Sequence, residues 1–130
     1  MRSMLLAAIA ALGPVLAGCT ISQEEVRAEP VRFTMTVTAS FDTLATCVAG
    51  RSAHDYVVTP QIYQSEGVAY VTLAAKSAPT VQSEYFIRRS GTNTSTVEWR
   101  RRKLIAGQGG SEEQARENIE ACSKPFARQA

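Results

Sequence analysis

The sequence predicts an α+β domain: an antiparallel sheet of about five strands with two helices on one face, in the order β-α-β-β-β-β-α. Three observations lead to this prediction. Residues 31–38 alternate between apolar and polar, four later runs are rich in β-branched and aromatic residues, and two segments have helical periodicity. We expect one domain, residues 31–130.

The first strand and the first helix follow directly on each other. The strand is predicted from the alternating apolar residues Val31, Phe33, Met35 and Val37. Ser40 is placed to cap the helix, and Gly50 is its expected end. Its apolar positions recur at helical spacing in Phe41, Leu44, Ala45 and Val48.

Four further strands are expected at residues 56–64, 68–75, 81–89 and 94–103, separated by turn signals. A two-residue turn at Gly91 and Thr92 would join the last two strands. In that register Phe86 lies opposite Val97, and Glu84 lies opposite Trp99.

A second helix is predicted to begin after the glycine-rich segment 107–110. Ser111 and Gln114 have the spacing of a capping box. We expect the helix to bury Ala115, Ile119 and Cys122.

Residues 1–18 have the parts of an export signal: a charge at Arg2, an apolar stretch, and small residues before Cys19. The apolar stretch is shorter than the ~20 residues that cross a bilayer, and it contains Pro14. The segment is therefore expected to be removed.

Leu16-Ala17-Gly18-Cys19 resembles the lipobox of bacterial lipoproteins. The resemblance implies that Cys19 is lipidated, becomes the first residue, and anchors the protein to a membrane of the bacterial envelope. Two or three acyl chains would hold it there almost irreversibly. In the sorting pattern that belongs to this resemblance, Asp directly after the cysteine would retain the protein at the inner membrane. Thr20 stands at that position, so the resemblance implies that the protein lies at the outer membrane and faces the periplasm. Residues 19–30 are expected to form a lipidated tether that spans at most ~40 Å.

If Cys19 carries lipid, Cys47 and Cys122 remain as a pair in a compartment where disulfides persist. We expect them to be bonded and to link the two helices. They do not form the Cys-x-x-Cys arrangement that is usual for redox-active pairs.

The composition and the scattered polar residues give no sign of catalysis. Loss of Arg2 with the signal leaves 13 of the 14 Lys and Arg against 12 Asp and Glu, a balance that argues against nucleic acid as a partner. His54, the only histidine, stands beside Asp55 and near Ser52, but sequence neighbours rarely form a triad. We therefore predict no catalytic residue, cofactor or metal site.

Two surface features are candidates for binding. Alternation along a strand predicts that Arg89, Arg100 and Arg102 share one face, where they could contact lipid headgroups, lipopolysaccharide phosphates or an acidic glycan. The alternative is a charged edge strand protected from aggregation. The tyrosines, which could line the sheet face away from the helices, are Tyr56, Tyr63, Tyr70 and Tyr85.

Together these observations predict a lipid-anchored envelope protein with a non-catalytic binding or assembly role and an envelope protein, lipid or anionic glycan as partner. A carrier of an apolar or lipid ligand is the alternative, and it requires a cavity between helices and sheet. A small envelope hydrolase is the third class.

Overall fold

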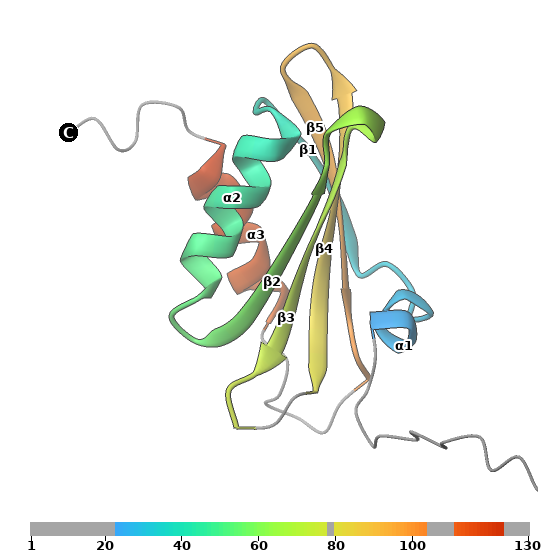
Figure 1. Cartoon of the computed structure of the whole chain (residues 1–130), viewed down its shortest axis with the longest axis vertical. Coiled ribbons are helices and arrows are strands. Elements are labelled where there is room, and N and C mark those ends of the chain that lie inside the picture. Colours follow the sequence, from blue (N-terminus) through green and yellow to red (C-terminus); the bar gives the residue numbers. More distant parts are fainter. Residues whose placement is uncertain (1–22, 78–79, 104–110, 124–130) are drawn as a thin grey trace, which may run out of the picture.

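The computed structural model describes residues 23–77, 80–103 and 111–123. Its centre is a five-stranded antiparallel sheet with the strand order β1-β5-β4-β3-β2 (Figure 1). The elements are α1 (Gln23–Arg27), β1 (Phe33–Val37), α2 (Phe41–Ser52), β2 (Tyr56–Tyr63), the 3-10 helix η1 (Gln64–Glu66), β3 (Val68–Ala75), β4 (Val81–Gly91), β5 (Thr94–Arg101) and α3 (Glu112–Cys122). The predicted α+β class is confirmed.

The two faces of the sheet carry different helices. Helices α2 and α3 lie together on one face, called here the α2–α3 face, and α1 lies on the other, the α1 face (Figure 1). The hydrophobic core fills the space between the sheet and α2 and α3. Its largest fully buried side chains are those of Trp99, Tyr85, Leu44, Ile87 and Ile119.

The register of β4 and β5 differs by one residue from the prediction. Tyr85 lies opposite Trp99, and Ile87 lies opposite Val97. The cause is at the turn, where Gly91 pairs with Thr94 and a bulge follows between Arg89 and Gly91. Because a shift of one residue exchanges the faces, Glu84 and Phe86 point to the α1 face instead of lying opposite Trp99 and Val97.

The helix starts agree with the prediction better than the helix ends. Helix α2 begins after Ser40 as expected, but the Ser40 side chain makes no capping hydrogen bond. The helix continues past Gly50 to Ser52, because Ala49 and Ser52 are still buried against the core. Helix α3 is capped as expected, since the Ser111 hydroxyl accepts a hydrogen bond from the Gln114 backbone N–H at 3.1 Å. Its buried residues include the predicted Ala115, Ile119 and Cys122.

A disulfide between Cys47 and Cys122 joins α2 to α3, as predicted. The two Cα atoms are 5.7 Å apart, and 75 residues separate the cysteines in sequence. The bond therefore closes a long loop that contains most of the sheet.

The predicted tether is wrong from Gln23 onward. Residues Gln23–Arg27 form α1, and Val26 is fully buried between this helix and the sheet. A helix of five residues with one buried position, Val26, contains no repeat of apolar residues, so its sequence shows no helical periodicity. The predicted signal peptide, the lipobox and Cys19 lie outside the described residues. Within the described ranges, no helix has the length and apolar character needed to span a membrane.

Candidate functional site

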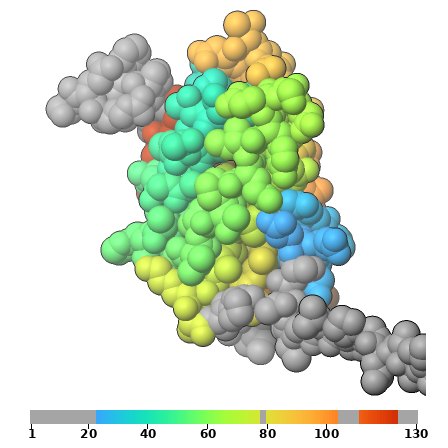
Figure 2. Space-filling view, viewed as in Figure 1, coloured from blue at the N-terminus to red at the C-terminus, as the bar shows by residue number. Residues whose placement is uncertain are grey.

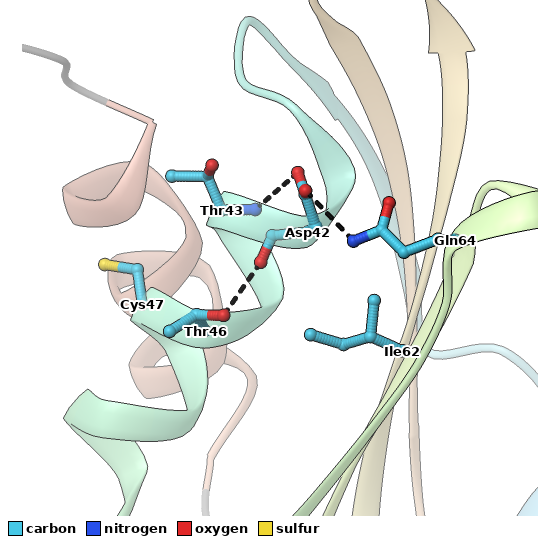
Figure 3. Close-up of a pocket in the computed structure, with 6 residues that line it drawn as sticks. All are labelled: Asp42, Thr43, Thr46, Cys47, Ile62 and Gln64. Atoms are coloured by element: carbon cyan, nitrogen blue, oxygen red, sulfur yellow. Dashed lines mark hydrogen bonds between the residues drawn. The ribbon is translucent and has the colours of Figure 1, made fainter.

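A groove of about 570 Å³ lies between α2 and the edge strand β2. In the space-filling view the teal surface of α2 and the green surface of β2 and η1 meet on one face of the molecule (Figure 2). The residues that line the groove are Asp42, Thr43, Thr46, Cys47, Ile62 and Gln64. Helix α2 thus supplies one wall of the groove, and β2 with η1 supplies the other (Figure 3).

A hydrogen bond connects the two walls at one end of the groove. The Gln64 side-chain amide donates to Asp42 Oδ2 at 3.2 Å, and the Thr43 backbone N–H donates to Asp42 Oδ1 at 2.9 Å (Figure 3). These bonds, that from Gln64 first, lower the pKa of the Asp42 carboxyl below its ordinary value. The groove therefore carries a negative charge at neutral pH.

Strand β2 exposes apolar side chains on both of its faces, with Ile62 in the groove and Val57 and Tyr63 on the α1 face. Among the described residues, the exposed large hydrophobic side chains are Val31 at 36%, Val57 at 53%, Ile62 at 37% and Tyr63 at 41%. Three of these four belong to β2. The same strand contains Pro60, whose missing N–H is a common protection of edge strands against strand addition.

The α1 face carries a polar network around Glu84, whose side chain is almost completely buried. Arg27 Nε donates to Glu84 Oε1 at 2.9 Å, and Arg27 Nη2 donates to Oε2 at 3.1 Å. The Thr72 hydroxyl donates to Oε2 at 2.9 Å and accepts from the Gln23 amide at 2.8 Å. Each oxygen of the buried carboxylate therefore has a donor, as burial of a charge requires.

The tyrosines divide between the two faces. Tyr70 lies on the α1 face, where the Arg27 guanidinium carbon is 4.0 Å from its ring centroid. The Tyr63 and Phe86 rings also contact Tyr70, with centroids at 6.1 and 4.9 Å. Tyr85 is instead buried on the α2–α3 face, together with the half-buried Tyr56. A single face lined by all four tyrosines, which the sequence suggested, does not form.

The three arginines expected to act together do not share a face. Arg100 lies opposite Glu84 on the α1 face, and alternation places Arg102 there too. Arg89 lies opposite Ser95 on the α2–α3 face, with its guanidinium carbon 4.9 Å from the Phe41 ring centroid. The alternative prediction, a charged edge strand protected from aggregation, is also wrong, because β5 pairs with both β1 and β4 and is not an edge strand. Arg100 Nε donates to the Glu29 carbonyl at 3.0 Å, so this side chain holds the segment after α1.

His54 lies in the turn between α2 and β2, and its side chain is exposed. Its carbonyl oxygen accepts a hydrogen bond from the Lys76 ammonium at 2.6 Å. Within the part of the chain that the structure describes, no three His, Cys, Asp or Glu side chains gather in a way that could hold a metal ion.

Comparison with protein-family models and with curated proteins finds no match to this chain. The groove and the Arg27–Glu84 pair were not predicted from the sequence. The one sequence feature that pointed to the ion pair is Glu84, which is the only charged residue between Val81 and Ile87 of the strand.

Proposed function

We propose that this chain is a lipid-anchored protein of the bacterial envelope, attached through Cys19 to the outer membrane and facing the periplasm. It binds a segment of a partner protein in the groove between α2 and β2, without catalysing a reaction. The lipobox supports the attachment, and the position of α1 supports a short connection, since Gln23 follows Cys19 by only a few residues.

The observation that carries the binding proposal is the groove itself, in which the exposed apolar side chain of Ile62 lies beside the ionised Asp42. Concave sites that combine apolar side chains with a few convergent polar groups are the usual form of a binding site. The partner segment needs an apolar side chain to contact Ile62 and a basic one to pair with the ionised Asp42. Because Pro60 has no N–H to donate, we expect side-chain contacts rather than strand addition to dominate.

The direction of the groove favours a periplasmic partner over a lipid of the anchoring membrane. Helix α1, which follows the anchor, packs near Glu84 and Arg100 toward one end of the sheet. The start of α2 and η1, which supply Asp42 and Gln64 to the groove, lie toward the opposite end of the strands (Figure 1). A lipid-anchored domain therefore presents this end of the groove away from its own membrane.

Site-specific photocrosslinking in intact cells tests the proposal. A photoreactive residue replaces Ile62 in the groove, and the matched control replaces Thr34, which is exposed on β1. We expect a discrete protein adduct from position 62, none from position 34, and loss of the adduct when Thr46→Trp fills the groove. Equal labelling from both positions, or an adduct that persists with Thr46→Trp, contradicts the proposal.

The volume of the groove favours one second candidate, a carrier of an apolar small molecule. About 570 Å³ falls within the usual range of small-molecule pockets. Native mass spectrometry of the purified protein distinguishes the two functions. A carrier retains a small molecule that Thr46→Trp removes, whereas a protein-binding domain shows the mass of the chain alone.

A further inference from the structure

Among the buried polar atoms that have no hydrogen-bond partner in the described residues, two belong to neighbouring strands on the α2–α3 face. They are Ser83 Oγ on β4 and Trp99 Nε1 on β5, and each residue is only 1% exposed. Buried polar groups nearly always have a partner, so two such atoms close together require an explanation.

Both residues line one small cavity below the first turn of α3. The cavity holds about 20 Å³, which is enough for one water molecule or one oxygen-bearing group. Its other walls are formed by Tyr56, Leu73, Tyr85, Ser111, Gln114, Ala115 and Asn118. It shares no lining residue with the groove between α2 and β2.

The surrounding polar side chains are already held in place. Asn118 Oδ1 accepts from Arg51 Nε at 3.1 Å and from the Gln114 amide at 3.3 Å. Asn118 Nδ2 donates to the Tyr85 hydroxyl at 3.3 Å. The cavity is therefore a preformed site, in which the indole N–H of Trp99 can only donate and the Ser83 hydroxyl can donate as well.

We propose that this cavity is a binding site for one neutral hydrogen-bond-accepting oxygen, supplied by a bound water molecule or by the carbonyl group of a small amide. The donors Trp99 and Ser83 select an acceptor, and the positive end of the α3 dipole acts in the same direction. Glu112 and Glu113 in the first turn of α3 disfavour an anion. A carboxylate should therefore bind less well than an amide of the same size.

The experiment uses the fact that Trp99 is the only tryptophan of the chain, so that the protein has a single indole N–H signal. The full chain, labelled with ¹⁵N and purified in detergent, is examined by NMR for a cross-peak between this N–H and water. It is then titrated with formamide and, as the matched anion, with formate. The variants are Ser83→Ala, which removes one donor, and Ser83→Val, which fills the cavity. Ser95→Ala is the control, because Ser95 is a fully buried serine whose hydroxyl already donates to the Ala39 carbonyl at 2.6 Å.

A water cross-peak that persists in Ser83→Ala and Ser95→Ala but disappears in Ser83→Val identifies bound water as the source. A saturable shift of the indole signal with formamide but not with formate, absent in Ser83→Val, identifies a carbonyl oxygen. The proposal is overturned if neither signal appears, or if the water cross-peak disappears in Ser83→Ala without any formamide response, because exchange with the Ser83 hydroxyl then explains it. An equal response to formate overturns the selectivity for a neutral oxygen.

Discussion

Arg27 and Glu84 form a two-point ion pair that holds the first helix on the sheet, with N–O distances of 2.9 and 3.1 Å. A five-residue helix has no stability of its own in water, so its position depends on such contacts and on the buried Val26. Because Gln23 follows Cys19 so closely, the same pair fixes one end of the domain at ~14 Å or less from a lipid attached at Cys19.

Arg27→Ala should lower the free energy of unfolding by about 1–3 kcal/mol, because it leaves the buried Glu84 carboxylate with the Thr72 hydroxyl as its side-chain donor. The Arg27 side chain is 36% exposed, so water replaces part of the lost contact and the cost stays below that of a fully buried pair. Urea unfolding measures the change. Arg88→Ala, an exposed arginine on the same face, is the control, and an equal loss there contradicts the prediction.

Patterns within one element were readable from the sequence. The limits of β3 were predicted without error, and the capping of α3 followed from Ser111 and Gln114. The link between the two helices was also readable, from the pair Cys47 and Cys122. The register of β4 against β5 was not, because the bulge near Gly91 shifts it by one residue and so exchanges the faces of the side chains.

The candidate site was even less accessible from sequence. Arg27 and Glu84 are 57 residues apart, and no local pattern connects them. The groove depends on how far α2 lies from β2, which packing decides and periodicity does not. The basic residues illustrate the same limit, since the face of Arg89 depends on a register that the sequence did not specify.

Two glycine substitutions should have opposite effects. Gly67 has a φ of +66°, and an added Cβ would lie 3.3 Å from the Cβ of Arg89. Gly67→Ala should therefore lower the free energy of unfolding by about 1–2 kcal/mol. Gly50 lies inside α2 with open space around it, so Gly50→Ala should raise the free energy of unfolding by about 0.5–1 kcal/mol. Thermal unfolding of both variants checks the pair. A loss of stability in Gly50→Ala would contradict the account of α2.

Reduction of the Cys47–Cys122 disulfide should lower the free energy of unfolding by about 2–5 kcal/mol, because the bond restrains a loop of 75 residues in the unfolded chain. Urea unfolding with and without a thiol reductant gives the difference. The variant Cys47→Ala/Cys122→Ala is the control and should not respond to the reductant. Wild-type protein that is equally insensitive contradicts the prediction.

Cys19→Ser should abolish lipidation and release the protein from the membrane fraction. The measurement is incorporation of an alkyne-labelled fatty acid, followed by mass spectrometry of the N-terminal peptide. The control is again Cys47→Ala/Cys122→Ala, which keeps Cys19 and should remain labelled. An unmodified Cys19 thiol in the wild-type protein contradicts the lipobox interpretation.

Stability should fall at alkaline pH because of Tyr85. Burial raises the pKa of its phenol above the ordinary value, and the hydroxyl accepts a hydrogen bond from Asn118 at 3.3 Å. An unfolded tyrosine loses its proton near pH ~10, whereas the folded one keeps it to higher pH. The unfolded state therefore binds fewer protons in this window, and the stability that is complete below pH ~10 is lost as the pH rises toward the folded pKa.

Tyr85→Phe isolates this effect. The variant should lower the free energy of unfolding by about 1 kcal/mol at neutral pH, because Asn118 loses its acceptor. It should also remove most of the fall in that free energy above pH ~10. Tyr56, whose pKa burial also raises, leaves a smaller residual slope in the same direction. Urea unfolding of the wild-type protein and of Tyr85→Phe at several pH values between ~8 and ~11 measures how steeply the stability of each declines. If Tyr85→Phe loses stability above pH ~10 as steeply as the wild-type protein, the alkaline transition belongs to another group.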